Sequence, residues 1–299
     1  MALSLTRYHS PDPVISQYRL IVDLLQRIPT TALDSITVVG GQAMLFWALR
    51  YVYWEDSPFH LNPAEKRAVT SSDLDFYSTD RKAIEACAQG WLGEVRYPNM
   101  DDNTPNTAIV QIPMGAEDPY GIDFLGTLKG LDERVLDKLW DTFVFNGEEI
   151  RFLSPPLCLA SRIHNYCGLG YSEEHLEREA NRIHLAIRLT RRYLCELLDD
   201  FIIYGQPAGH QRPKICLGIL RYLDQLFVHR DTTDVVMATN AQPLDAIPAD
   251  HAGWPRLTRE RQIPDIISKA KAHYHRKAQH KYAHLKDGQP LPPGMATWL

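Results

Sequence analysis

Three aspartates in short apolar segments are the residues of this chain best suited to chemistry. Asp73 and Asp75 flank a single leucine in a segment predicted to be a strand, and Asp123 lies between Ile122 and Phe124. Side chains alternate along a strand, so Asp73 and Asp75 are expected on the same face, with Cα atoms roughly 6.5–7 Å apart. Carboxylates this close repel each other, by roughly 4 kcal/mol at about 4 Å and an effective dielectric of 20. Three ionised carboxylates therefore predict a bound divalent cation, and oxygen ligands favour Mg²⁺.

A double glycine, Gly40-Gly41, joins a β-branched segment to a helical pattern over residues 42–53. Backbone amides and the positive end of a helix can hold phosphate at such a junction. A plain tight turn is the alternative, because glycine is the default residue wherever φ must be positive. Asp-x-Asp alone could likewise be a pair of acids that blunts a strand edge. The ordered combination favours a catalytic site, because charge inside apolar strands is costly unless it is used.

Length and composition indicate a soluble globular protein. The 299 residues are 44% apolar and 23% charged, with a net charge of −5, and they suffice for two domains or one large one. The negative net charge argues against wholesale polyanion binding, although a local basic surface can coexist with it. Basic residues gather near the C-terminus at Arg256, Arg259, Arg261, Lys269, Lys271, Arg276, Lys277, Lys281 and Lys286.

The five cysteines are scattered, and none forms a C-x-x-C pair. This usage is typical of reduced thiols in a cytosolic protein and not of a disulfide framework or a zinc site. The N-terminus lacks the pattern of a signal peptide, and the best apolar run, residues 43–49, is too short to cross a bilayer. We therefore expect a cytoplasmic protein with no membrane partner.

Hydrophobic spacing predicts an α+β fold: a small mixed sheet with helices, followed by an all-α C-terminal domain. Residues 1–154 form the predicted catalytic domain and residues 155–299 the helical one, with the boundary at Ser154-Pro155. Asn146-Gly147 predicts a hairpin turn. The segment 55–69 is expected to be an irregular surface excursion, and Thr79 is expected to cap a helix that ends near Leu92. The other helices are expected over 13–28, 42–53, 131–140, 157–167, 173–204, 213–229 and 264–286, and the strands over 35–39, 70–77, 95–97, 108–112, 121–125, 142–145 and 150–153.

These motifs carry a family resemblance. Gly40-Gly41, then Ser72-Asp73-Leu74-Asp75, then Asp123 resemble the signature of the nucleotidyltransferase fold shared with the DNA polymerase beta superfamily. Leu153-Ser154-Pro155 followed by a helix is similar to the toxin-like, abortive-infection branch of that superfamily, as is the helical C-terminal half. The resemblance covers roughly residues 35–165.

The resemblance implies a nucleotidyltransferase that moves a nucleoside monophosphate from a nucleoside triphosphate, such as ATP, to a hydroxyl. The acceptor would be an RNA such as tRNA, a protein or a small molecule, and a toxin of this branch would have a cognate antitoxin protein in a toxin–antitoxin or phage-defence system. Two Mg²⁺ ions would stabilise the displacement at the α-phosphorus. Asp73, Asp75 and Asp123 would be the catalytic and metal-binding residues, with Asp123 helping to deprotonate the hydroxyl. The implied phosphate contacts are Gly40, Gly41, Gln42, Ser72 and Arg162.

The chain departs from that branch in three places. Gln42 stands where a hydroxyl residue is usual, and Arg162 is the nearest basic residue to a usual lysine. An acid that usually follows in the next helix has Glu177 and Glu179 as its nearest counterparts. These departures keep open a catalytically inactive protein of the same fold that binds or regulates a partner. A metal-dependent phosphoesterase ranks lower, because it leaves Gly40-Gly41 without a phosphate tail to hold.

Three further features have two interpretations each. His164 lies two residues beyond Arg162 and could contact phosphate, although a lone helical histidine is more often packed in the fold. His280 and His284 have the i, i+4 spacing of a shared metal, but the surrounding lysines favour a solvated basic helix. Tyr274 and Tyr282 could stack a base beside bound RNA phosphates, and a charged surface helix is the equal alternative.

Overall fold

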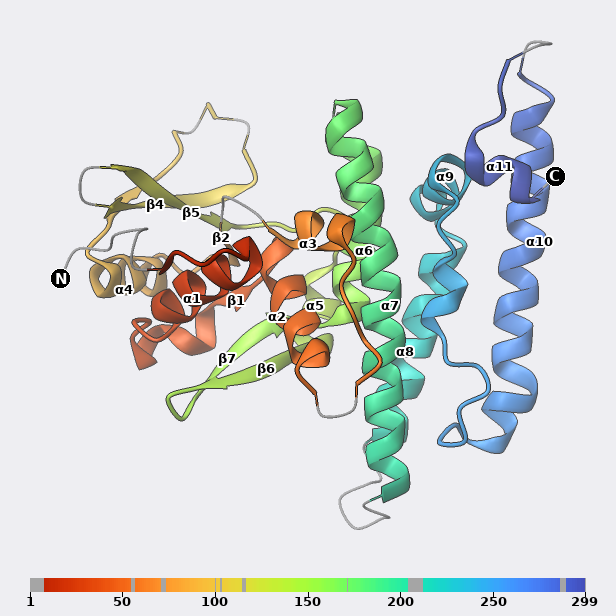
Figure 1. The fold of residues 1–299 in the computed structure, drawn as a ribbon, viewed down its shortest axis with the longest axis horizontal. Helices are drawn as coiled ribbons and strands as arrows, with labels where there is room; N and C mark the ends of the chain where they lie inside the picture. Colours follow the sequence, from red (N-terminus) through yellow and green to blue (C-terminus); the bar gives the residue numbers. More distant parts are fainter. Residues whose placement is uncertain are drawn as a thin grey trace. The chain divides into compact units, whose positions relative to one another are not determined.

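The computed structural model of the chain divides into two compact units, residues 1–161 and 162–299 (Figure 1). The division falls inside the helix α6 (Pro155–Gly168), and the predicted boundary, Ser154-Pro155, lies at the start of that helix. The first unit combines a sheet with helices, so the predicted α+β class is confirmed. The structure describes residues 8–54, 57–70, 74–99, 101–102, 104–114, 117–170, 172–203, 212–285 and 289–298.

A mixed sheet organises the first unit, and among the described residues it has seven strands, each of which overlaps a segment where a strand was expected. Their order across the sheet is β3-β4-β5-β2-β1-β7-β6. The pairs β2/β5 and β1/β7 are parallel and the other neighbours are antiparallel. The strands are β1 (Thr37–Val38), β2 (Leu74–Tyr77), β3 (Glu94–Arg96), β4 (Asn106–Met114), β5 (Glu117–Leu125), β6 (Trp140–Phe145) and β7 (Glu148–Leu153).

Most helices of this unit begin at a side-chain cap. Asp12 caps the first helix, with Pro13 at its first position, as predicted. Asp80, and not Thr79, caps α4, because its carboxylate accepts from the amides of Lys82 and Ala83. The helices are α1 (Pro13–Leu25), α2 (Gly40–Val52), α3 (Pro63–Val69), α4 (Arg81–Trp91) and α5 (Glu133–Leu139), with a 3₁₀ turn, η2 (Thr30–Ser35).

The core of this unit lies on one face of the sheet. Residues paired in register on adjacent strands point to the same face of the sheet. Phe76 pairs with Phe124, and Val38 pairs with both Phe76 and Phe152, so all four side chains lie on this face. Trp91 of α4 stacks on Phe76 with ring centroids 5.7 Å apart, and Phe46 of α2 packs against Phe152. The helices α2 and α4 cover this face. Side chains alternate along a strand, so the residues next to these phenylalanines point to the other face of the sheet.

The second unit is helical throughout its described residues, as predicted for the C-terminal part of the chain. In Figure 1, α8 runs beside α7, and it also packs against α9 and α10. The C-terminal α11 packs against α9 and α10. The elements are α7 (Glu173–Ile203), α8 (Arg212–Phe227), α9 (Arg230–Thr239), α10 (Ile263–Tyr282) and α11 (Pro293–Trp298), with a 3₁₀ turn, η3 (Pro243–Ala246), and a π-helical turn, η4 (Thr258–Gln262).

Several sequence predictions were wrong in detail. The segment 55–69, which was expected to be irregular, contains α3. This helix begins with a reciprocal capping box between Asn62 and Glu65. The helices α9 and α11 were not expected. Tyr274 is fully buried in α10, so it cannot stack a base, whereas Tyr282 is exposed. None of the described helices has both the length and the apolar composition needed to cross a membrane.

Candidate active site

Asp75 and Asp123 occupy the same register position in two adjacent parallel strands, β2 and β5. Their neighbours Leu74, Phe76 and Phe124 are buried in the core, whereas both aspartates are partly exposed. The two carboxylates therefore project from the face of the sheet opposite the aromatic core. Adjacent strands lie about 4.8 Å apart, which is close enough for one cation to contact a carboxylate from each.

The double glycine approaches this pair through Gly40. Gly40 begins α2 directly after β1 and has φ = +67°, a conformation that favours glycine. A β carbon built on it would lie 2.2 Å from Oδ2 of Asp75, so a side chain has no room there. The amide of Val39 also donates to the backbone oxygen of Asp75 at 3.0 Å. The start of α2 therefore lies against the Asp75 carboxylate.

Asn106 is a site residue that sequence reasoning missed. Its Nδ2 donates to Oδ1 of Asp123 at 3.2 Å, from the beginning of strand β4. The contact holds one oxygen of the carboxylate in place. No local motif indicated it, because Asn106 and Asp123 meet only through the register of the β4/β5 hairpin, which includes a bulge next to Asn106.

A cavity of about 190 Å³ lies on the same face of the sheet. Tyr77, two residues after Asp75 on β2, lines it together with Trp140 and Arg151. The Arg151 guanidinium lies over the Trp140 ring at 4.6 Å and donates to the backbone oxygen of Asp34. Burial raises the pKa of Tyr77, and the nearby Glu133 carboxylate raises it further, so the phenol stays protonated at neutral pH. The lining of this cavity includes neither Asp75 nor Asp123, so the cavity is not part of the carboxylate pair.

The other predicted phosphate contacts in the first unit differ in their placement. Gln42 lies in the first turn of α2 and is fully buried. Gly41 is also buried in that turn. Ser72 and Asp73 lie outside the described residues, so the structure gives the positions of two of the three predicted metal-binding carboxylates.

Arg162 lies in the second unit, where it is part of a buried ion-pair cluster. The Arg162 and Glu179 side chains are 8% and 3% exposed, and Nη1 of Arg162 is 3.5 Å from Oε2 of Glu179. Glu179 also accepts a short hydrogen bond from Arg182. Burial lowers the pKa of Arg182, and the neighbouring Arg162 charge lowers it further. Glu179, one of two candidates for the missing acid, is thus the residue that pairs with Arg162.

The donor set of the carboxylate site fits a hard divalent cation. Asp75 and Asp123 supply oxygen ligands on neighbouring strands, which is the ligand type that Mg²⁺ takes in proteins. The amides of the α2 N-terminus next to them suit the phosphates that usually complete the coordination of Mg²⁺. Oxygen ligands beside helix-terminal amides can hold a divalent cation together with a phosphate group.

Comparisons with known proteins do not assign this chain to a family. Neither a protein-family model nor a curated protein sequence matches it. Among solved structures, the chain is similar to an antigenic nucleotidyltransferase-like protein from Paracoccidioides brasiliensis, with 14% sequence identity and a TM-score of 0.33. That similarity covers 79% of this chain and 94% of the other. A TM-score this low carries no inference about function, so any function must come from the site residues themselves.

Proposed function

We propose that the chain is a metal-dependent nucleotidyltransferase that moves a nucleoside monophosphate from a nucleoside triphosphate to a hydroxyl acceptor. One observation carries the proposal: Asp75 and Asp123 share a register position on parallel strands, and Gly40 brings the start of α2 against Asp75. Transfer of a nucleoside monophosphate to a hydroxyl needs groups that position the reactants and groups that stabilise negative charge. The acidic residues on the strands and the glycine bend at the start of α2 are suited to these tasks.

Each part has a defined role in this proposal. Asp75 and Asp123, with Asp73 as the predicted third carboxylate, would hold Mg²⁺, and the ion would supply positive charge that stabilises the negative charge developing on the phosphate. Asn106 keeps the Asp123 carboxylate oriented, and Asp123 takes the proton of the attacking hydroxyl. Gly40 and Gly41 place backbone amides near the β- and γ-phosphates. The hydroxyl oxygen bonds to the α-phosphorus, the bond to the bridging oxygen breaks, and pyrophosphate leaves.

For the acceptor we propose an RNA such as a tRNA, on the basis of the basic residues along α10 and its flanks. Part of that charge is neutralised, because Lys269 pairs with Asp224 and Lys281 with Asp234. The exposed Tyr282 next to the basic residues remains suited to base stacking. The family resemblance adds a toxin role with a cognate antitoxin as partner.

The test is transfer of label from each α-labelled triphosphate to total cellular RNA in the presence of Mg²⁺. The proposal expects one triphosphate to label RNA, and expects Asp75→Asn and Asp123→Asn to abolish the labelling. Asp118→Asn is the matched control, since Asp118 is an exposed acid on the same strand β5. Equal labelling by all four proteins would refute the assignment of the site.

A second candidate function, a nucleotide-binding protein without transfer activity, is favoured by a separate observation. Two predicted phosphate contacts are not presented to a ligand in solution, since Gln42 is fully buried and Arg162 is buried in an ion pair with Glu179. Such a protein would still be stabilised by Mg²⁺ and a triphosphate, by about 2.7 kcal/mol at a hundredfold excess over Kd. Stabilisation with no label transferred to RNA, protein or small hydroxyl compounds would select this function over the enzyme.

A further inference from the structure

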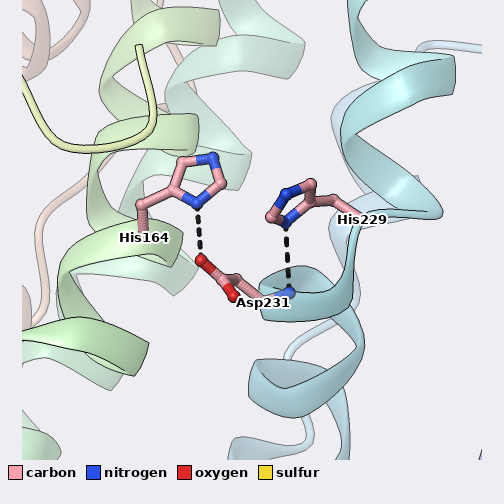
Figure 2. Close-up of side chains that lie close together, drawn as sticks. All are labelled: His164, His229 and Asp231. Carbon is pink, nitrogen blue, oxygen red and sulfur yellow. Dashed lines mark hydrogen bonds and ion pairs between the residues drawn. The ribbon is translucent and has the colours of Figure 1, made fainter.

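Three potential metal ligands meet in the second unit, apart from the carboxylate site. His164 lies on α6, His229 directly precedes α9, and Asp231 is in the first turn of α9. One ligand atom from each lies within 4.8 Å of the others. Figure 2 shows the two imidazole rings side by side, with Asp231 next to both. The rings are edge to face with centroids 4.8 Å apart. His164 thus meets two residues that follow it by 65 and 67 positions in the sequence.

Hydrogen bonds fix the three side chains in place. Nδ1 of His164 lies 2.7 Å from Oδ2 of Asp231, and His164 is buried. His229 caps α9, where its Nδ1 accepts from the Asp231 amide at 3.2 Å. Cys167, one turn after His164, donates its thiol to the backbone oxygen of Asp231 at 3.4 Å. The end of α6 and the start of α9 are therefore held together independently of any ligand.

The local charge favours a cation at this position. Asp231 contributes a carboxylate, which contacts His164 within the part of the chain that the structure describes. The next acid on α9, Asp234, is already neutralised by Arg230 and Lys281. The basic side chains near α9 are thus directed to Asp234, and the Asp231 carboxylate faces imidazoles. His229 is exposed, which gives an ion access from solvent.

We propose that His164, His229 and Asp231 form a binding site for a divalent transition-metal ion, Zn²⁺ in particular. Imidazole nitrogens with one carboxylate select Zn²⁺ over Mg²⁺ and Ca²⁺, which prefer oxygen ligands. Zn–N and Zn–O distances near 2.0–2.2 Å place tetrahedral ligands roughly 3.5 Å apart, so modest side-chain rotation closes the cluster around the ion. The fourth position is left to water.

Binding requires an unprotonated lone pair on each ring. The ion takes the place of the hydrogen bond between Nδ1 of His164 and Oδ2 of Asp231, and it takes the His229 Nδ1 lone pair from the Asp231 amide. The loss of that long cap hydrogen bond is small compared with the gain of a metal–nitrogen bond. The bound ion ties α6 to the start of α9, so it acts as a cross-link within the helical unit. This role is separate from the Mg²⁺ chemistry proposed for the first unit.

The test measures Zn²⁺ binding to chelator-dialysed full-length protein, by competition with a chromophoric chelator and by the absorption of bound Co²⁺. His229→Asn is the main variant, because asparagine can still accept the cap hydrogen bond but lacks the imidazole. Loss of an outer-shell partner commonly costs about 10- to 100-fold in metal affinity, so loss of a ligand should weaken Zn²⁺ binding by at least about 100-fold. Asp231→Asn should have the same effect.

His280→Asn is the matched control, because His280 and His284 form a second imidazole pair with ring centroids 4.8 Å apart. The proposal expects this variant to keep the high-affinity ion. It also expects Zn²⁺, but not Mg²⁺ at the same concentration, to raise the melting temperature of the wild type and not of His229→Asn. Zn²⁺ binding that survives His229→Asn and Asp231→Asn, or that is lost in His280→Asn, would overturn the proposal, as would no binding at all. Circular dichroism of each variant verifies the fold.

Discussion

The α carbon of Gly40 approaches the Asp75 carboxylate so closely that a β carbon there would lie 2.2 Å from Oδ2. Gly40 also has φ = +67°, so it combines a conformation and a contact that each exclude larger residues. The relationship joins the two motifs that stand 35 positions apart in the chain, the double glycine and the acidic strand. Any ligand that bridges Asp75 and the start of α2 depends on this close approach.

Gly40→Ala should therefore impair both stability and transfer. The positive φ costs roughly 1–2 kcal/mol for a non-glycine residue, and overpacking adds about 1–3 kcal/mol, so the free energy of unfolding should fall by about 2–5 kcal/mol. Urea denaturation measures the loss of stability. Label transfer from the triphosphate measures the loss of activity, which is expected because the Asp75 carboxylate must move.

Gly147→Ala separates the two causes. Gly147 has φ = +85°, but a β carbon built there meets nothing within 4 Å. Its substitution should cost only the backbone part, roughly 1–2 kcal/mol, with transfer unchanged. If Gly40→Ala were no more destabilising than Gly147→Ala, the contact with Asp75 would not constrain the site.

Asp75→Asn and Asp123→Asn should lower activity without lowering stability. Each removes a metal-binding carboxylate, and the loss of several kcal/mol of charge stabilisation predicts a decrease in transfer of at least about a hundredfold. In the presence of a chelator, each also removes repulsion between like charges on adjacent strands, so the melting temperature should stay the same or rise. A melting temperature that falls sharply in both variants would show that the carboxylates are structural.

Local sequence patterns were enough to predict the turns and most of the elements. Asn146-Gly147 predicts a hairpin, and the two residues have φ = +52° and +85°, as a tight turn between β6 and β7 requires. Asp12-Pro13 predicts the start of α1 for an equally local reason. By contrast, α3 was missed because few of its side chains are buried, although Asn62-Pro63 and Glu65 form a capping signal.

The site contacts could be predicted only in part, because they depend on strand order. Strand alternation predicted a shared face for Asp73 and Asp75, but the register match of Asp75 with Asp123 needs β2 beside β5, which no local pattern indicates. The Asn106 contact depends on a bulge in the β4/β5 hairpin. His164 and Asp231 meet through packing between helices, so sequence spacing treats His164 as isolated.

Glu179→Ala should be among the most destabilising substitutions in the helical unit. It would leave Arg162 and Arg182 buried without their shared carboxylate, and breaking a buried ion pair from one side costs about 3–5 kcal/mol. Urea denaturation of the full-length protein measures this loss. Glu177→Ala is the matched control. Glu177 lies two residues earlier on α7 and is exposed, so its substitution should change the free energy of unfolding by no more than about 0.5 kcal/mol. Equal stability of the two variants would contradict the buried cluster.

Asp12 should make a pH-dependent contribution to the stability of α1. A hydrogen bond from Lys66 lowers the pKa of this carboxyl below its usual value, and the amide of Val14 contributes in the same direction. Since the folded pKa is the lower one, the contribution is complete above the unfolded pKa of 3.8 and disappears as the pH falls through the folded value. Both partners are more than one-third exposed, so the ion pair contributes at most about 0.5–1 kcal/mol.

Two substitutions at Asp12 divide this contribution. Asp12→Asn keeps a cap acceptor for the Val14 amide, so it should lose only the ion pair with Lys66, and its deficit relative to wild type should vanish in acid. Asp12→Ala also loses the cap, which costs about 1 kcal/mol more at neutral pH. Urea unfolding at pH 7 and near pH 3 measures both effects. A deficit of Asp12→Asn that is the same at both pH values would show that Lys66 does not set the pKa of Asp12.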